Sequence, residues 1–183
     1  MVSQTSVQYD LAVAQCREIF ANKMKDYGSA WRILRISSIT DQVYIKAQRI
    51  RSIEEKGTQK VDEGVKSEFI GIVNYAVIAL IQLELGEKHQ EMEIPLQKSL
   101  TWFDKKITEA KSLMDKKNFD YDEAWRQMRI SSLTDIILMK LMRVKQIEDH
   151  HGETLISEGI EANYHDIINY ASFAIIRLDE EKN

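Results

Sequence analysis

The chain has 183 residues, of which 44% are hydrophobic and 30% are charged, and its formal net charge is −4. This composition is that of a soluble globular protein, and the negative charge argues against nucleic acid or an anionic membrane as the partner. The single cysteine, Cys16, excludes an intramolecular disulfide, so we expect a reducing, cytoplasmic location.

The chain carries one sequence pattern twice. Residues 26–55 and 120–149, which are 94 positions apart, are identical at 15 of 30 aligned positions. A second shared block begins at Glu63 and at Glu158, after a one-residue insertion. A duplication of this length predicts two units that fold alike and pack as a pseudo-twofold pair, in one compact molecule. The predicted divisions are a first repeat, a linker and a second repeat, at 1–86, 87–96 and 97–183.

The first helix of each repeat is predicted over about 7–25 and 99–117. Only seven glycines and one proline occur in the whole chain, which favours long helices. No segment shows the clean alternation of a strand. The predicted fold class is therefore all-α, with two homologous helical-bundle repeats.

The second helix of each repeat has a predicted start. Ser38 and Asp41 fit a capping box, as do their counterparts in the second copy. This helix is predicted to end near Lys56 in the first copy and near His150 in the second, because each is close to a glycine.

The last helix of each repeat is predicted over about 62–85 and 155–178. In the first copy its apolar part, from about 69 to 85, is interrupted by Asn74 and Gln82. That stretch is too short and too polar for a membrane span, so we expect a buried core helix.

A lysine interrupts the apolar face of the second helix in both copies. Lys46 lies seven residues after Ile39, and Lys140 holds the same place in the second copy. A lysine buried there without a partner would lose its proton or destabilise the fold, so it must meet a carboxylate, a wet cleft or an anionic ligand. Arg49 and Arg143 lie three residues further on and add to the positive charge.

Three interpretations of these cations remain open. In the first, Lys46 and Arg49 form a structural ion-pair layer with Asp26, Asp41 or Glu63. In the second, they form a pocket for phosphate groups, with lysine as a point charge and arginine as a fork. In the third, the long side chains extend along the surface into water.

The last helix of the second repeat carries a candidate metal pair. Glu158, Asp166 and Asn169 are spaced to share one helix face. Carboxylates in such an arrangement can hold Mg²⁺ together with substrate phosphates. The first copy has Gly71 in place of Asp166, so two equivalent metal sites are not expected. Asn74, the counterpart of Asn169, is interpreted equally well as a buried amide bonded to a neighbouring helix.

The histidines and the cysteine carry no motif. His165 lies on the last helix but has Ile70 as its counterpart. The adjacent His150 and His151 point in different directions, so a solvated helix end is expected there rather than a metal site. Nothing in the sequence activates Cys16 as a nucleophile.

Taken together, these motifs resemble the nucleotide-modification-associated domain, a family of unknown function. In the first copy the matching residues are Lys23, Asp26-Tyr27, Lys46-x-x-Arg49, Glu63 and Asn74-Tyr75-Ala76. In the second copy they are Lys117, Asp120-Tyr121, Lys140-x-x-Arg143, Glu158, Asp166 and Asn169-Tyr170-Ala171. The resemblance covers nearly the whole chain, once per repeat.

That family in turn looks like an outlying branch of the MazG-like all-α NTP pyrophosphohydrolases. The resemblance implies a helical bundle, dimeric or internally duplicated, that cleaves nucleoside triphosphates with Mg²⁺. Those enzymes usually carry an ExxE pair where this chain has Lys46-x-x-Arg49, and the later acid is kept only as Asp166. The carboxylate cage is incomplete, so hydrolysis is not carried over, whereas nucleotide binding is compatible with the sequence.

The sequence therefore predicts a cytoplasmic protein that binds a nucleotide-like small molecule, with no nucleic acid or membrane partner and with further oligomerisation left open. If it is catalytic, we expect phosphoanhydride hydrolysis, with Mg²⁺ held by Glu158 and Asp166. The alternative is a non-catalytic interaction or scaffold module with a structural ion-pair layer. The predicted phosphate- and nucleotide-binding residues are Lys46, Arg49, Lys140, Arg143, Asp26, Tyr27, Asp120, Tyr121, Asn74 and Asn169.

Overall fold

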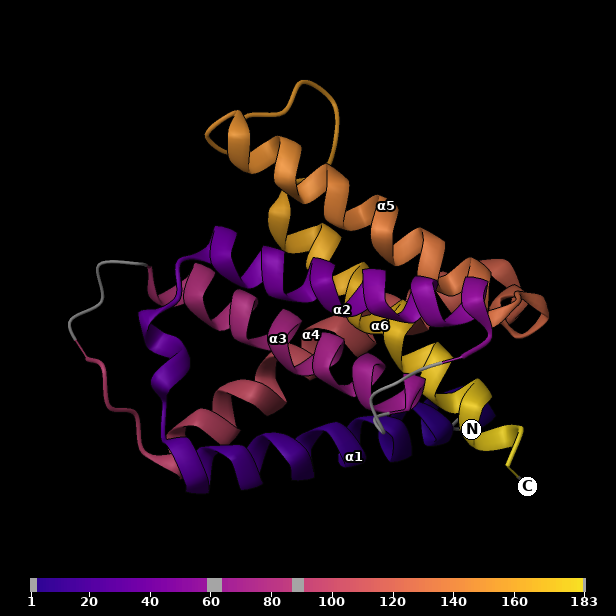
Figure 1. Ribbon diagram of the computed structural model, residues 1–183, viewed down its shortest axis with the longest axis horizontal. Coiled ribbons are helices and arrows are strands. Elements are labelled where there is room, and N and C mark those ends of the chain that lie inside the picture. The colour runs from indigo at the N-terminus through magenta and orange to yellow at the C-terminus, as the bar shows by residue number, and fades with distance from the viewer. Residues whose placement is uncertain (1–2, 59–63, 87–90, 183) are drawn as a thin grey trace.

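A computed structural model describes residues 3–58, 64–86 and 91–182 (Figure 1). These residues form helices and connections and contain no strand, which confirms the all-α class. The first repeat consists of α1 (Gln4–Tyr27), the short 3-10 helix η1 (Ala30–Ile33), α2 (Ile36–Lys56) and α3 (Val65–Leu85). The second repeat has the same order: α4 (Leu96–Tyr121), η2 (Ala124–Gln127), α5 (Ile130–Asp149) and α6 (Ile160–Glu180).

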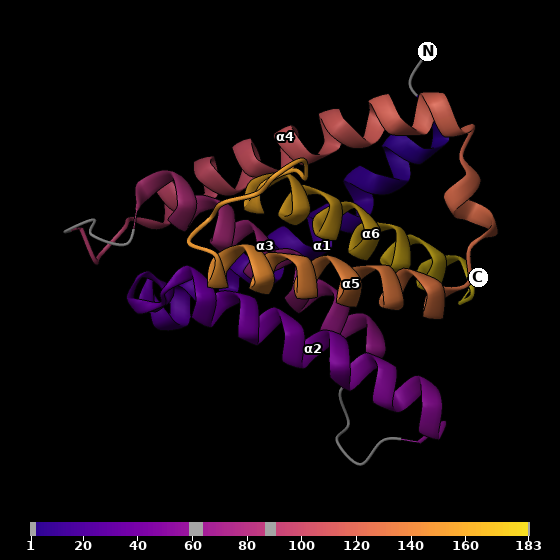
Figure 2. The ribbon, with the colours of Figure 1, turned by 90° about the horizontal axis from the view of Figure 1, so that it is seen from above.

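The six long helices pack in three layers of two, each layer holding one helix from each repeat. The last helices, α3 and α6, pack against each other in the middle (Figure 2). On one side they contact α2 and α5, which also contact each other, and on the other side they contact α1 and α4. The two repeats are therefore halves of one pseudo-twofold bundle.

One hydrophobic core runs through both repeats and includes buried residues from all six long helices. The central helix α3 is apolar around most of its circumference because neighbours cover it on both sides. By length and composition alone α3 could cross a membrane, but 67% of its apolar window is buried inside the molecule. It is the core helix that the sequence predicts.

The helix starts differ from the predicted ones. The capping-box prediction was wrong, because α2 begins at Ile36 with Arg35 as its N-cap residue, and no side chain caps it. Thr40 lies inside the helix, with its hydroxyl oxygen 3.1 Å from the carbonyl oxygen of Ile36. The predicted end at Lys56 is confirmed, and Gly57 follows it in the left-handed conformation (φ 66°).

The two repeats are joined by contacts that recur with the partners exchanged. The hydroxyl of Thr40 in α2 donates to Glu148 in α5 (2.6 Å), and the hydroxyl of Thr134 in α5 donates to Glu54 in α2 (2.7 Å). Burial raises the pKa of both glutamates, and the threonine hydrogen bonds only partly offset this effect. This reciprocity is what a pseudo-twofold axis between α2 and α5 requires.

The described part of the predicted linker lies against the first repeat. The hydroxyl of Ser29 donates to the carbonyl of Met92 (2.7 Å) and accepts from the amide of Ile94 (2.8 Å). Leu96, which the linker prediction included, is the first residue of α4. The chain therefore enters the second repeat beside the turn that follows α1.

Candidate functional site

The first repeat contains a cavity of about 950 Å³. It lies between α1, η1 and α3, and Lys46 reaches it from α2. Among the residues that the structure describes, four lysines line it and Glu68 is the one carboxylate. Aromatic and aliphatic side chains form much of the remaining wall, which makes it a partly apolar pocket of positive character. The lysines are Lys23, Lys46, Lys66 and Lys182.

The second repeat contains a smaller cavity, of about 230 Å³, at the equivalent place. Every residue that lines it corresponds to a residue that lines the first cavity. An incidental packing gap would not be expected to follow the duplication in this way, so we interpret both as versions of one ancestral site. The corresponding pairs include Lys23 and Lys117, Tyr27 and Tyr121, Trp31 and Trp125, Gly71 and Asp166, Asn74 and Asn169, and Tyr75 and Tyr170.

The turn that carries the tryptophan is held in the same way in both repeats. In the first, Gln82 of α3 donates to the carbonyls of Arg32 (3.2 Å) and Leu34 (2.8 Å). In the second, Arg177 occupies the position of Gln82 and donates to the equivalent carbonyls (2.7 and 2.6 Å). The aromatic wall of each cavity is thereby fixed to the last helix of its own repeat.

Asp166 fills the centre of the second site. Its Oδ1 accepts a hydrogen bond from Lys117 (2.6 Å), its Oδ2 accepts one from Lys140 (2.8 Å), and its side chain is 5% exposed. Burial alone would raise the pKa of Asp166, but the two lysines outweigh this effect and hold that pKa below its usual value. The second cavity therefore has its positive charge neutralised by its own carboxylate.

The first repeat has Gly71 where the second has Asp166. The side chain of Lys46 crosses this glycine so closely that an added Cβ would lie 3.0 Å from its Cδ and Cε atoms. Lys46 extends instead to Glu68, with 3.6 Å between Nζ and Oε2, and Arg49 binds the other oxygen of Glu68 at 2.8 Å. The counterpart of Glu68 is Asn163, which has no carboxylate. The carboxylate of the first repeat therefore lies one helical turn before the position that Asp166 holds in the second repeat.

This displacement leaves positive charge in the first cavity. Lys23, the counterpart of Lys117, is exposed and forms no ion pair with any residue that the structure describes. The ammonium of Lys46 lies 3.6 Å from Glu68 and 5.6 Å from the centre of the Tyr75 ring, whereas 2.8 Å separates Lys140 from Asp166. Two ammonium groups that a carboxylate bridges in the second repeat are thus available to another anion in the first.

The two asparagines make the same tie to the first helix of their repeat. The amide nitrogen of Asn74 donates to the carbonyl of Cys16 (3.0 Å), and that of Asn169 donates to the carbonyl of Ala110 (3.0 Å). The interpretation as buried amides bonded to a neighbouring helix is therefore correct for their nitrogen atoms.

The oxygen atoms of these asparagines differ. Oδ1 of Asn169 accepts a hydrogen bond from the hydroxyl of Tyr9 (2.8 Å). Oδ1 of Asn74 is buried and has no hydrogen-bond partner in the described structure, although Asn74 lines the cavity and is only 7% exposed. The reason lies in the sequence, because Phe103 is the counterpart of Tyr9 and has no hydroxyl. A buried acceptor without a partner indicates a missing donor.

The structure brings some of the predicted site residues together and leaves others apart. Lys46, Tyr27 and Asn74 line the first cavity; Tyr121, Asn169 and Asp166 line the second. Lys140 lies behind the second cavity, in contact with Asp166. The predicted residues that line neither cavity are Asp26, Arg49, Asp120, Lys140, Arg143 and Glu158.

Of the three predicted partners of Lys46, Asp26 and Asp41 were wrong, and Glu63 is untested. Asp26 is exposed, Asp41 pairs with Lys145 (2.9 Å), and Glu63 lies outside the described residues. Among the described residues, Lys46 pairs with Glu68. Neither lysine extends freely into water, since the side chain of Lys46 is 26% exposed and that of Lys140 is 13% exposed.

Two further lysines belong to the site although they were not among the predicted binding residues. Lys23 and Lys117 occupy the same offset in the two copies and precede the Asp-Tyr pair by three residues. The occurrence of the same residue at the same position of both copies could have identified these two lysines. Glu68 offered no such signal, because its counterpart in the second copy is Asn163.

The predicted metal pair does not fit Mg²⁺ in this geometry. Glu158 is exposed and precedes Gly159, the N-cap residue of α6, so it lies outside the helix that carries Asp166. Both oxygens of Asp166 already accept from ammonium groups, and the nearby positive charges disfavour a divalent cation. No catalytic step is assigned to these two residues.

Comparison with known families gives a match that occurs twice along the chain. The family model described as nucleotide modification associated domain 1 matches residues 23–83 and 117–178, which together make up more than half of the chain. Each match begins at the lysine of its own cavity, Lys23 or Lys117, and includes the helix that carries the asparagine. No curated protein and no solved structure matches the chain. The relationship to the MazG-like enzymes stays a prediction.

Proposed function

The chain belongs to the nucleotide modification associated domain 1 family, and from the geometry of its first cavity we propose that it binds a nucleotide or a nucleotide derivative there. One observation carries the proposal. In the second repeat a carboxylate lies between two lysines, and in the first repeat the equivalent position is Gly71. Asp166 therefore marks the place that an anionic group of the ligand would take in the first repeat.

The charge and the size of the first cavity support a phosphate-bearing ligand. Lys23 and Lys46 correspond to the two lysines that hold Asp166, and lysine binds phosphate as a compact point charge. A volume of about 950 Å³ is at the upper end of the range of small-molecule sites, whereas about 230 Å³ falls below it. The first cavity has room for a nucleotide, and the second does not.

The remaining wall suits a base and a sugar. Tyr27 is largely exposed at the cavity, and Trp31 and Tyr75 are partly buried in its wall. Aromatic faces of this kind stack with nucleobases. The free Oδ1 of Asn74 would accept a hydrogen bond from an N–H or O–H group of the ligand.

A purely structural ion-pair layer accounts for the second repeat but not for the first. It explains why Asp166 lies between Lys117 and Lys140. It does not explain why Lys23 lacks an ion-pair partner in the described structure or why the oxygen of Asn74 is buried without a donor. We therefore favour binding over a scaffold role, and we place the protein in the cytoplasm, where the buried free thiol of Cys16 would stay reduced.

A thermal-shift screen tests the proposal. The ligands are nucleoside mono-, di- and triphosphates, with the unphosphorylated nucleosides and inorganic phosphate as comparisons. A ligand at 100 times its Kd stabilises the native state by about 2.7 kcal/mol, which corresponds to a rise in Tm of roughly 5–10 °C at this chain length. At least one phosphorylated nucleoside is expected to raise the Tm more than its parent nucleoside does.

Lys23→Met provides the variant, and Lys25→Met provides the matched control. Both lysines are exposed near the end of α1, but only Lys23 lines the cavity. Lys23→Met should keep the Tm of the free protein and lose most of the ligand-induced shift, while Lys25→Met should keep both. The proposal is wrong if no nucleotide raises the Tm, or if the two variants respond alike.

A further inference from the structure

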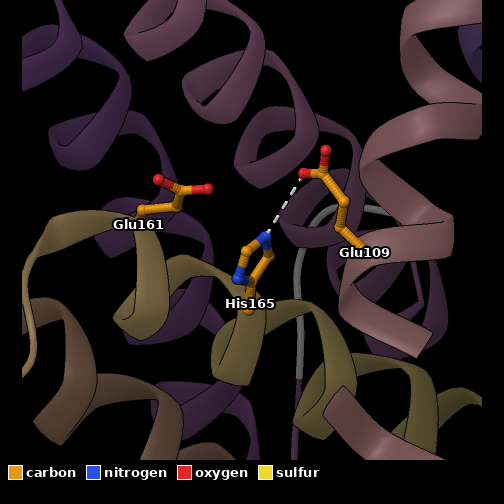
Figure 3. A group of neighbouring side chains, drawn as sticks. All are labelled: Glu109, Glu161 and His165. Carbon is orange, nitrogen blue, oxygen red and sulfur yellow. Dashed lines mark ion pairs between the residues drawn. The ribbon is translucent and has the colours of Figure 1, made fainter. Parts of the chain in front are cut away.

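Three side chains with metal-binding atoms lie together on the second repeat, and none of them lines either cavity. Glu109 projects from α4, and Glu161 and His165 project from α6, four residues apart and therefore on one helix face (Figure 3). One ligand atom from each lies within 4.8 Å of the others. We infer that this cluster binds a divalent transition-metal ion of the Zn²⁺ class.

The distance between His165 and Glu109 fits two ligands of one metal ion. Nε2 of His165 lies 3.7 Å from Oε2 of Glu109, which is too long for a hydrogen bond. Two ligands of a tetrahedral zinc ion, each bonded at about 2.1 Å, are about 3.4 Å apart. A shift of a few tenths of an ångström would bring both atoms to ligand positions.

The imidazole itself indicates a missing partner. The side chain of His165 is 14% exposed, and its Nε2 atom is fully buried without a hydrogen-bond partner among the described residues. Figure 3 shows the ring between the two carboxylates, with Nε2 turned toward Glu109. Glu161 is exposed and can close on the ion by rotating its side chain.

A neighbouring lysine does not prevent this role. Lys106 donates to both oxygens of Glu109 (3.2 and 3.5 Å), and its ammonium also lies 2.5 Å from Oε2 of Glu84. The charge of Lys106 is therefore already opposed by a second carboxylate. Metal-binding carboxylates commonly accept such an outer hydrogen bond, which orients them toward the ion.

Ordinary structural roles explain only part of the cluster. Glu109 can serve as an ion-pair partner of Lys106, and Glu161 is an acid in the first turn of α6, where the helix dipole favours it. Neither role explains a buried Nε2 that has no hydrogen-bond partner among the described residues. A metal ion would explain all three residues.

The cluster occurs in the second repeat and has no equivalent in the first. The equivalent positions hold Gln15, Lys66 and Ile70, all of which line the first cavity. The same surface is thus basic and apolar in one repeat, and carries two carboxylates and an imidazole in the other. One imidazole nitrogen with carboxylate oxygens suits Zn²⁺, Mn²⁺ or Co²⁺ better than Mg²⁺ or Ca²⁺. Three protein ligands leave a coordination position for water or another ligand.

Metal titration of the chelator-treated protein tests the inference. Zn²⁺ is added in competition with a chromophoric zinc chelator, and Co²⁺ is added in parallel while the visible absorption band of the bound ion is recorded. One ion per chain is expected, with a Co²⁺ band that Zn²⁺ removes. No nucleotide is present, so the result is independent of the proposed nucleotide site.

His165→Ile is the decisive variant because isoleucine is the residue found there in the first repeat. It should weaken Zn²⁺ binding at least about tenfold and abolish the Co²⁺ band, since loss of an outer-shell group alone costs 10–100-fold in affinity. Glu109→Gln, on the surface of α4, should also weaken Zn²⁺ binding. It serves as the test variant if His165→Ile does not fold. His150→Gln with His151→Gln is the control and should bind as the wild type does. Absence of binding at micromolar Zn²⁺, or unchanged binding in both His165→Ile and Glu109→Gln, overturns the inference.

Discussion

The two repeats place the same lysines around the same kind of cavity, and they differ in where the opposing carboxylate lies. In the second repeat Asp166 lies between Lys117 and Lys140, and the cavity is small. In the first repeat the carboxylate is Glu68, one turn earlier on the last helix, and Gly71 places no carboxylate beside Lys46. A duplicated site can thus stay open in one copy while the other fills it with its own side chain.

A second difference acts in the same direction. Tyr9, from the first helix of the first repeat, donates to Asn169 of the second repeat. Phe103 cannot return this hydrogen bond, so the oxygen of Asn74 has no hydrogen-bond partner in the part of the chain that the structure describes. As a result, the polar groups of the second cavity have partners within the protein, whereas those of the first cavity can bind a ligand.

Removing the carboxylate of Asp166 should have the largest effect. Asp166→Asn leaves Lys140 nearly buried beside Lys117 without a counter-charge, which we expect to lower the free energy of unfolding by about 3 kcal/mol. Urea unfolding measures this change. Asp120→Asn, at an exposed position of the same repeat, is the control and should stay within about 0.5 kcal/mol of the wild type. A loss below about 1 kcal/mol for Asp166→Asn would contradict its role as the internal counter-ion.

Placing an aspartate in the first cavity should reproduce the closed state. Gly71→Asp puts a carboxylate beside Lys46, and only the flexible methylenes of that lysine must move to make room. We expect the affinity for the nucleotide identified by screening to fall about 30-fold, since a charge-assisted contact contributes about 2 kcal/mol. Gly71→Asn, of the same size but uncharged, should lose much less. Equal losses in the two variants would show that steric blocking, not charge, closes the site.

Removing the hydroxyl of Tyr9 should make the second repeat resemble the first. Tyr9→Phe leaves Oδ1 of Asn169 buried without its donor, which should lower the free energy of unfolding by about 1–2 kcal/mol. Tyr44→Phe is the matched control, because its hydroxyl accepts a hydrogen bond from Gln48 at an exposed position. If the two variants have the same stability, the hydrogen bond to Asn169 contributes nothing.

The smallest expected effect is the pH dependence that Asp166 adds to the stability of the protein. The pKa of Asp166 is lower in the folded protein than the usual value of about 3.9. Below about pH 4 the unfolded chain binds the proton first, so the stabilisation is lost as the pH falls toward the folded pKa. Urea midpoints at pH 7, 4 and 3 should therefore fall more steeply for the wild type than for Asp166→Asn. Parallel curves would contradict the role of the two lysines in lowering that pKa.

The architecture could be predicted from the sequence because its signals are local and duplicated. Helical spacing and the 94-residue offset determine the elements and their pairing, and the lysine on the apolar face already indicates an anion nearby. The partner of that lysine could not be predicted, since Glu68 meets Lys46 only when α3 packs on α2. The capping prediction failed because side-chain type alone does not fix where a helix starts. Ser38 and Asp41 have the side chains of a capping box, but they lie inside the helix, two and five residues after its start.

The remaining parts of both candidate sites depend on contacts between separate helices. Glu109, Glu161 and His165 have no shared motif and meet only through the packing of α4 on α6. The free oxygen of Asn74 likewise depends on the identity of Phe103 in another helix. Such relations become visible only when the fold places the two segments side by side.

Isothermal titration of a phosphorylated nucleoside into the wild type, Lys23→Met and Lys117→Met tests the central claim most directly. The account predicts one ligand per chain, strong weakening by Lys23→Met, and little change of affinity in Lys117→Met, whose lysine is occupied by Asp166. Two ligands per chain, or weakening by Lys117→Met while Lys23→Met binds normally, would contradict an open first cavity and a self-filled second one.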